Sequence, residues 1–314
     1  EAATVAWAPL GWDCVGVAEI EKFPAAVLAH HYPDVPNLGD VTKITKHDVE
    51  RLGPIDLVCG GFPCQDLSVA GQRKGLKNVD GSATRSGLFF DAMRIAEWAN
   101  PRWLFIENVP GMFSSNQGRD FAAVVGEMAG CEFDVPREGW RNAGVVAGPK
   151  GLVEWTVLDA QYHGLAQRRK RVFLVRDSGD WANRAPLFLE QYRLCGNPAP
   201  SREAGQSAAR GVEIGPSGGC YSDLSPTLNP TAVAIGLDQE LNGRYELAGT
   251  LQRKGEGGFE GSVMTPDLQV RRLTPTEAEK LQGFEPGYTA IPWRKKPADQ
   301  CPDGPRYKAL GNSW

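Results

Sequence analysis

The chain has 314 residues, a length that suits one large domain with a smaller addition. Its formal net charge is −4. It contains no run close to the roughly 20 apolar residues of a transmembrane helix, and no segment resembles a signal peptide. The 7 cysteines lack any Cys-x-x-Cys pair, which argues against a disulfide framework or a metal site and predicts a cytoplasmic location.

The first 177 residues alternate strand and helix patterns, which is typical of an α/β fold with a parallel sheet. Short aliphatic and β-branched runs predict strands, whereas apolar residues at helical spacing predict helices. We expect helices at 2–8, 23–31, 88–99 and 121–129, and strands at 14–19, 55–59, 103–107, 154–159 and 171–176.

The character of the chain changes near residue 178. From there to residue 269 it is rich in Gly, Pro, Ser and Asn, with little helical periodicity. Such a composition predicts a smaller, loop-rich domain. We therefore expect residues 1–177 and 270–314 to belong to the larger domain and 178–269 to form the second.

A helix is predicted shortly after this region. Thr274 is placed to cap it, Pro275 suits its first position, and Glu277 completes a capping box. Gly283 marks its end.

Chemically useful side chains follow or enter several predicted strands. Cys64 comes after a turn in which Pro63 fixes φ, Glu107 ends the strand 103–107, and Arg169 and Arg171 lead into the last strand. Ligands of open α/β folds bind at the carboxyl ends of the strands. Alternation places the two arginines on one face, where they would favour a thiolate. Burial should raise the pKa of Glu107. A lone cysteine is more often a small buried hydrophobe, so it is this combination that indicates a nucleophile.

The chain resembles the DNA cytosine-5 methyltransferase family in four ordered segments, Gly61-Phe62-Pro63-Cys64-Gln65, Glu107-Asn108-Val109, Gln167-Arg168-Arg169-Lys170-Arg171 and Gly311-Asn312-Ser313. Residues 271–284 are similar to the family's helix that supports the target-recognition domain. The resemblance implies a Rossmann-like S-adenosylmethionine-dependent methyltransferase sheet. It also implies that 178–269 is the target-recognition domain.

The resemblance further implies methyl transfer from S-adenosylmethionine to carbon 5 of a flipped-out cytosine in duplex DNA. Cys64 would add to carbon 6 while Glu107 protonates or stabilises ring nitrogen 3. Arg171 would contact the cytosine carbonyl oxygen, and Arg169 the surroundings of Cys64 and a phosphate. The protein would be a monomer, with a cognate restriction endonuclease acting separately.

Binding residues follow from the same resemblance. Glu19 matches the acidic residue that holds the ribose hydroxyls, and Ile20 a position that stacks on adenine. The matched cofactor positions are Glu19, Ile20, Asp40, Val41, Pro63, Leu88 and Asn312. The segment 65–85 resembles the mobile loop that closes over DNA, with Gln65, Ser68, Arg73, Lys74 and Arg85 as the expected DNA contacts.

The chain departs from the family pattern at its two ends. The glycine-rich Phe-x-Gly-x-Gly turn is absent, and residues 1–4 resemble the helix that follows it. The helix that normally follows Asn312-Ser313 is absent too. We therefore expect a truncated chain with weakened cofactor binding.

Two alternatives stay open. One is a transfer RNA methyltransferase of the same family, and the other is a catalytically impaired relic that binds DNA without turnover. A cysteine phosphatase is disfavoured because Ala70 stands where its loop needs arginine. A nicotinamide dehydrogenase is disfavoured because no Gly-x-Gly-x-x-Gly turn follows a strand.

Overall fold

The computed structural model describes residues 2–62, 87–183, 187–188, 212–214, 220–222, 253–254, 258–259, 262–264 and 270–312. Within these ranges no helix is both long enough and apolar enough to cross a membrane.

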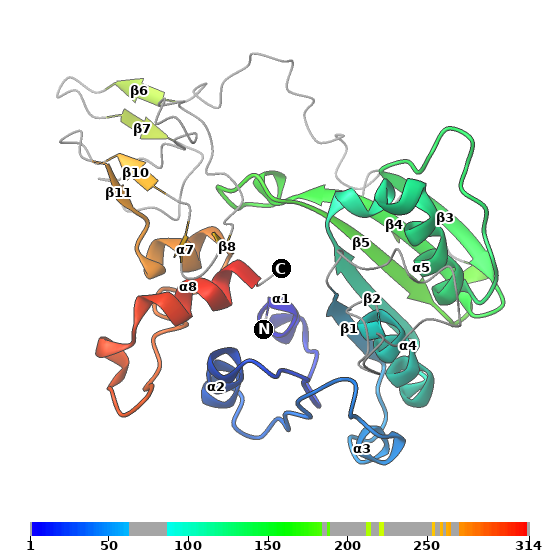
Figure 1. The fold of residues 1–314 in the computed structure, drawn as a ribbon, viewed down its shortest axis with the longest axis horizontal. Helices are drawn as coiled ribbons and strands as arrows, with labels where there is room; N and C mark the ends of the chain where they lie inside the picture. Colours follow the sequence, from blue (N-terminus) through cyan, green and yellow to red (C-terminus); the bar gives the residue numbers. More distant parts are fainter. Residues whose placement is uncertain are drawn as a thin grey trace, which may run out of the picture.

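A five-stranded mixed sheet lies on the right in Figure 1. Its strands are β1 (Leu57–Gly61), β2 (Trp103–Asn108), β3 (Ala143–Gly148), β4 (Gly151–Asp159) and β5 (Lys170–Asp177), in the spatial order β1-β2-β5-β4-β3. The four strands predicted between residues 55 and 176 are confirmed with small shifts at their ends. Strand β3 was not predicted.

Within this sheet only the β1–β2 pair is parallel, so the expectation of a parallel sheet is wrong. A parallel pair needs a crossover of about a dozen residues or more, usually a helix. The connections after β3 and β4 are too short and contain no such helix. These connections therefore join antiparallel neighbours, β3 with β4 and β4 with β5, and β5 is also antiparallel to β2.

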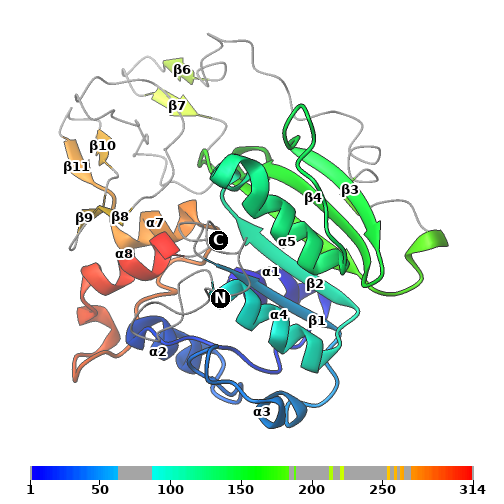
Figure 2. The same ribbon diagram turned by 45° about the vertical axis from the view of Figure 1, so that its right-hand side comes forward.

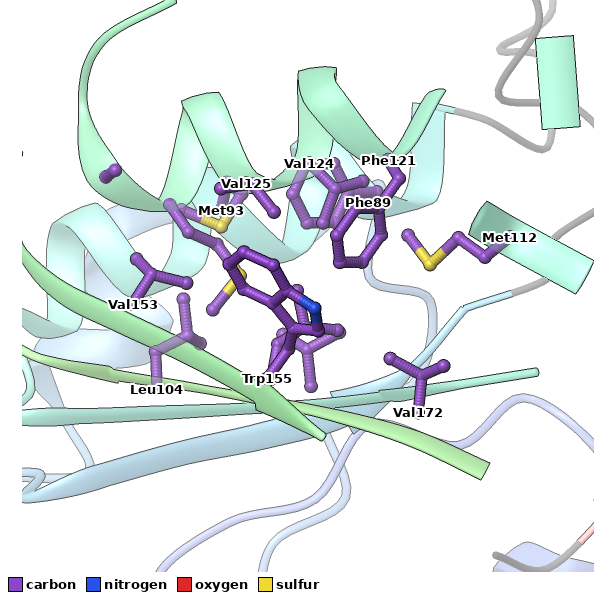
Figure 3. Close-up of a cluster of buried hydrophobic side chains, with 14 of the residues drawn as sticks. Phe89, Met93, Leu104, Met112, Phe121, Val124, Val125, Val153, Trp155 and Val172 are labelled. Carbon is purple, nitrogen blue, oxygen red and sulfur yellow. The ribbon is translucent and has the colours of Figure 1, made fainter. Parts of the chain in front are cut away.

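Two helices, α4 (Gly87–Ala99) and α5 (Arg119–Ala129), cover one face of the sheet (Figure 2). Both confirm predicted helices. Their apolar sides meet the sheet in a core arranged around Trp155, as Figure 3 shows. The core is built from Phe89, Met93, Phe121, Val124, Val125 and Met128 on the helices and from Leu104, Ile106, Val153, Trp155, Val172 and Leu174 on the strands.

The opposite face of the sheet contacts α1 (Ala2–Trp7). The ring of Trp7 lies edge-on to Phe105 of β2 at a centroid distance of 5.4 Å, and Phe105 lies 5.5 Å from Phe173 of β5. Helix α1 also packs through Ala2 and Val5 against a cluster formed by the end of the chain.

That cluster includes α7 (Pro275–Leu281) and α8 (Asp303–Asn312). The predicted capping box is confirmed, because Thr274 Oγ1 accepts a hydrogen bond from the Glu277 amide while Glu277 Oε2 accepts one from the Thr274 amide at 2.7 Å. Gly283 follows with φ +80, as its role as a helix stop requires. Segments from both ends of the chain thus pack together.

The remaining helices are short. Helix α2 (Lys22–His31), which was predicted, packs through Phe23 and Val27 against Ile291 and Ala309. Helix α3 (Lys46–Glu50) has its own capping box at Thr45. The 3₁₀ turns are Ala8–Leu10, Pro110–Phe113, Ser115–Gly118, Ala160–Tyr162, Trp181–Asn183 and Ala298–Gln300.

Three antiparallel pairs of short strands lie at or near the predicted second domain: β6 (Val212–Ile214) with β7 (Cys220–Ser222), β8 (Arg253–Lys254) with β9 (Gly258–Phe259), and β10 (Ser262–Met264) with β11 (Val270–Arg272). The division of the chain into 1–177, 178–269 and 270–314 stays a prediction.

The strand predicted at 14–19 is not formed. In this segment Val17 makes a single parallel bridge, to Asn37. The neighbouring backbone groups of Glu19 bond to the Asn37 side chain instead of to a second strand. A side chain therefore replaces the hydrogen bonds that would have extended the pairing.

Candidate active site

A buried ion pair lies at the edge of the sheet where β2 ends and β5 begins. The Nε of Arg171 is 2.7 Å from Oε1 of Glu107, and the two side chains are 16% and 11% exposed. Arg171 also donates from Nη1 to the carbonyl oxygen of Lys170 at 2.8 Å. The antiparallel register, in which Glu107 pairs with Phe173, brings these residues of distant segments together.

Arg169 lies beside this pair and is buried as well. Its backbone amide donates to Oδ1 of Asp159 at 3.0 Å, which fixes the chain as it enters β5. Arg169 and Arg171 both act electrostatically on Glu107. Both charges therefore lie close enough to Glu107 to affect its protonation.

Burial dominates the protonation of this cluster. It raises the pKa of Glu107, and Arg171 and Arg169 offset only part of that shift. Burial, together with the charge of Arg171, lowers the pKa of Arg169 to about 10, while Glu107 acts in the opposite direction. The predicted rise in the pKa of Glu107 is confirmed. Such a carboxyl group holds its proton at a higher pH than an ordinary glutamate does.

The neighbouring strand β1 is tied to the same edge. Gly61 pairs with Glu107, and the buried side chain of Asn108 donates from Nδ2 to the carbonyl oxygen of Phe62 at 3.0 Å. The Asn108 Oδ1 accepts the amide of Val109 at 2.8 Å. Asn108 thus fixes the last described residue before Pro63 and Cys64.

A second group of predicted residues lies in the loops after α1 and α2. Oε1 of Glu19 accepts the amide of Glu21 at 2.7 Å, so the carboxylate is held at the start of α2. The next residue, Ile20, is 70% exposed. An exposed aliphatic side chain beside an anchored carboxylate suits a ligand with an apolar ring and hydroxyl groups.

The loop around Asp40 is anchored to α4. Oδ1 of Asp40 accepts the amide and the hydroxyl of Thr42, and these bonds lower the pKa of Asp40. Arg94 on α4 donates to the carbonyl oxygens of Val41, at 3.0 Å, and of Ile44, at 2.8 Å. Arg94 therefore fixes the loop that carries Asp40 and Val41 to the helix that begins near Leu88.

The last predicted cofactor residues lie at helix ends. Leu88 is half-buried in the first turn of α4, and Asn312 is exposed at the end of α8. Both views show the end of α8 beside the start of α1 (Figures 1 and 2).

A family model described as C-5 cytosine-specific DNA methylase matches residues 2–193, a span that contains the Glu107–Arg171 pair. The chain belongs to the C-5 cytosine-specific DNA methylases. It shares their S-adenosylmethionine-dependent methyltransferase fold, as a likeness to the crystal structure of S. pombe Dnmt2 methyltransferase shows. That likeness has a TM-score of 0.59 at 15% identity and covers 99% of this chain and 90% of that one.

Two curated relatives of this methylase chain align over nearly its whole length. It is 30% identical to a protein of Escherichia phage P1 named DNA N-6-adenine-methyltransferase, covering 100% of this chain and 58% of the relative. It is 26% identical to Type II methyltransferase M.HpaII of Haemophilus parainfluenzae, covering 98% and 81%. The chain spans 34% of another relative, M.NgoBV of Neisseria gonorrhoeae. It therefore covers between about a third and three fifths of several relatives that it matches.

The structure describes part of the predicted site, and the roles of its residues stay predictions. It brings Glu107, Arg169 and Arg171 together, and it places Glu19, Ile20, Asp40 and Val41 in neighbouring loops. The predicted residues that lie outside the described ranges are Pro63, Cys64, Gln65, Ser68, Arg73, Lys74 and Arg85.

Three residues that anchor the segments carrying the predicted site residues were missed from the sequence: Asn37, Arg94 and Asn108. Each binds backbone groups of a distant segment, so its role depends on tertiary contacts. Asn108 had a usable signal, since it directly follows Glu107 at a strand end. Asn37 and Arg94 gave none.

Proposed function

We propose that the chain transfers a methyl group from S-adenosylmethionine to carbon 5 of a cytosine in duplex DNA. The observation that carries this proposal is the buried pair of Glu107 and Arg171, with Arg169 beside it. The pair lies at the edge of the sheet where Asn108 binds the backbone of Phe62. Cys64 follows Phe62 by two residues in the sequence. Membership of the C-5 cytosine-specific DNA methylases supports the same reaction.

The proposed chemistry starts with a covalent bond. Carbon 5 of cytosine is a poor nucleophile until a group adds at carbon 6. The Cys64 thiolate adds there while Glu107 gives a proton to ring nitrogen 3, so that the electron pair moves to carbon 5. A carboxyl group whose pKa is raised suits the donor role. Once carbon 5 carries the methyl group, a base removes the proton on carbon 5, and the electron pair re-forms the double bond to carbon 6 as Cys64 leaves as a thiolate. Ring nitrogen 3 returns its proton to Glu107.

The arginines have different tasks in this proposal. Arg171 already touches Glu107 and would direct its remaining donors to the cytosine carbonyl oxygen, which gains negative charge during the addition. Arg169 supplies a second positive charge, which favours the thiolate form of a nearby cysteine.

The residues of the second group fit S-adenosylmethionine in part. The anchored carboxylate of Glu19 suits the ribose hydroxyls, and the exposed face of Ile20 suits the adenine ring. The Asp40 carboxylate already accepts a hydrogen bond from the Thr42 hydroxyl. A contact between Asp40 and the cofactor stays a prediction. Pro63, Leu88 and Asn312 would complete the site. When bound, the cofactor supplies the electrophilic methyl group.

The DNA side of the proposal rests on the sequence. A stacked cytosine cannot be reached, so the base must flip out of the duplex. Gln65, Ser68, Arg73, Lys74 and Arg85 would contact the DNA, and residues 178–269 would read its sequence. We propose a cytoplasmic monomer, with any cognate restriction endonuclease acting as a separate protein.

A second candidate function comes from the phage P1 relative, whose name is DNA N-6-adenine-methyltransferase. Methylation at adenine nitrogen 6 uses an exocyclic amine as the nucleophile, so it needs neither a thiol that adds to the ring nor an acid at a ring nitrogen. The Glu107–Arg171 pair is therefore better suited to cytosine.

The test is methyl transfer from labelled S-adenosylmethionine to plasmid DNA and to transfer RNA, followed by mass spectrometry of the nucleosides. We expect 5-methylcytosine in DNA, with at least a hundredfold loss of rate in Glu107→Gln and in Arg171→Ala. The control is Glu138→Gln, which changes an exposed carboxylate and should keep the wild-type rate. N6-methyladenine or methylated transfer RNA as the product would overturn the proposal.

A relic without turnover is tested with DNA that contains 5-fluorocytosine. The fluorine cannot leave as a proton does, so an active enzyme stays bonded to the base. We expect a denaturation-resistant complex in the wild type that is lost in Cys64→Ala. DNA binding with no complex in the wild type would favour the relic.

A further inference from the structure

One side chain links the two loops that carry the predicted adenosine contacts. Oδ1 of Asn37 accepts the backbone amides of Glu19 and Gly39, each at 3.0 Å. Its Nδ2 donates to the carbonyl oxygen of Glu19, also at 3.0 Å. The Asn37 amide thus uses both its donor and its acceptor on backbone groups that lie 18 and two residues away.

The local backbone explains why a side chain is needed here. The two segments pair only at Val17, whose amide donates to Pro36 and whose carbonyl oxygen accepts the amide of Leu38 at 2.7 Å. Gly39 then adopts φ +72, which turns the chain away and ends the pairing. The backbone groups of Glu19 would lose their protein partners at this point, and the Asn37 amide supplies them.

The groups held by Asn37 carry the residues predicted to bind the cofactor. Fixing the Glu19 backbone fixes the point from which its side chain leaves the chain, and the Glu21 amide holds the carboxylate at 2.7 Å. It also fixes the backbone position of the next residue, Ile20. Fixing Gly39 sets the start of Asp40 and Val41. A ligand that contacts both loops requires a constant spacing between them.

We propose that Asn37 is a positioning residue for the adenosine half of S-adenosylmethionine, which it serves by fixing the spacing between Glu19–Ile20 and Asp40–Val41. This role depends on the proposed function, because it presumes that these loops bind that cofactor. Asn37 itself need not touch the ligand.

The test compares the affinity of variants for S-adenosylhomocysteine by titration calorimetry. We expect Asn37→Ala to weaken binding by about tenfold, because the loops lose their shared anchor. Asn37→Asp should weaken it as well, since an anionic oxygen would then face the Glu19 carbonyl oxygen. Asn37→Ser, which keeps a short hydroxyl group, should fall between the wild type and Asn37→Ala.

The matched control is Asp34→Ala, an exposed position in the same loop, which should bind as the wild type does. Kinetics separate positioning from a general loss of structure. We expect the KM for S-adenosylmethionine to rise in Asn37→Ala while kcat at saturating cofactor and the KM for DNA stay within about twofold of the wild type.

The outcomes separate the two levels of inference. If the wild type binds S-adenosylhomocysteine and the Asn37 variants bind it equally well, the positioning role is wrong. A loss of kcat and of melting temperature with unchanged affinity would also overturn that role, because Asn37 would then be merely structural. If the wild type does not bind, it is the proposed function that fails.

Discussion

Arg171 and Glu107 meet at 2.7 Å across the antiparallel pair β5–β2, although 64 residues separate them in the chain. The contact places the positive charge of Arg171 beside the carboxyl group of Glu107, to which we assign the contact with cytosine nitrogen 3. Even so, burial outweighs the arginines and the pKa of Glu107 is raised. The geometry therefore favours a proton on Glu107 while keeping it hydrogen-bonded, which is the state that a proton donor needs.

The raised pKa of Glu107 predicts how stability depends on pH. Above the ordinary value of 4.5 the unfolded chain loses this proton before the folded chain does. The contribution of Glu107 is therefore greatest below pH 4.5 and is lost as pH rises through the folded-state pKa. We expect the free energy of unfolding of the wild type, relative to that of Glu107→Gln, to fall by at most about 1.4 kcal/mol per pH unit in this window.

Urea unfolding of both proteins between pH 4 and pH 8 measures this difference. The exposed Glu138→Gln variant serves as the control and should show no such fall. A relative stability that rises with pH would mean that the arginines outweigh burial, which contradicts the raised pKa.

A second prediction concerns Asn108 and the covalent step at Cys64. Replacing Asn108 by Ala removes the donor to the Phe62 carbonyl, which is a buried bond, and the acceptor for the Val109 amide, which is a part-buried one. We expect a cost of about 2–3 kcal/mol in the free energy of unfolding. We also expect slower adduct formation with 5-fluorocytosine DNA, since Phe62 leads directly to Cys64.

The matched control for Asn108 is Asn142→Ala, which changes an exposed asparagine before β3. It should leave both stability and adduct formation unchanged. Adduct formation at the wild-type rate in Asn108→Ala would show that the Phe62 anchor does not serve the nucleophile.

Much of this site could be predicted because it follows from local patterns. Alternation along the entry to β5 placed Arg169 and Arg171 on one face, and Glu107 was read as the end of its own strand. Their meeting was not predicted, because it depends on the antiparallel direction of β5. The Thr274 capping box could be read directly, since all its members lie within one turn of helix. Such features need no knowledge of the tertiary contacts.

The errors have tertiary causes. Strand β3 begins Ala143-Gly144, a poor strand sequence, yet Gly144 is favoured there because the Trp155 ring occupies the space that a Cβ would need. The strand expected at 14–19 failed because Asn37 takes the hydrogen bonds of Glu19. In both places a residue outside the segment, Trp155 on the neighbouring strand or Asn37, affects the local structure, so a pattern read over a short window is misleading.

Ile20 predicts a gain in affinity. Its side chain is 70% exposed beside the anchored Glu19, so an aromatic residue there would offer a larger stacking surface to adenine. We expect Ile20→Phe to bind S-adenosylhomocysteine about three to ten times more tightly, which corresponds to the binding free energy that an aromatic contact contributes. Calorimetry on Ile20→Phe and on Leu10→Phe checks this, because Leu10 is equally exposed at 72% but lies outside the predicted site. Equal gains in both variants, or none in Ile20→Phe, would contradict stacking at this position.

Replacing the buried carboxylate of Glu279 should cause a large loss of stability. It is fully buried and accepts hydrogen bonds from the Gly287 amide at 2.6 Å, the Thr289 amide at 2.8 Å and Arg306 at 2.9 Å. Glu279→Gln would turn an NH₂ group toward one of these donors and leave Arg306 without its counter-charge.

We expect Glu279→Gln to cost about 3 kcal/mol or more in the free energy of unfolding. The exposed Glu285→Gln should change it by less than about 0.5 kcal/mol. The loss should also lower the melting temperature. The affinity for S-adenosylhomocysteine per folded molecule should not change, because Glu279 bonds to Gly287, Thr289 and Arg306, none of which is a predicted cofactor residue. Denaturant unfolding and calorimetry measure the two quantities separately. A Glu279→Gln variant with the free energy of unfolding of the wild type would show that the charge of Glu279 adds no stability to this hydrogen-bonded network.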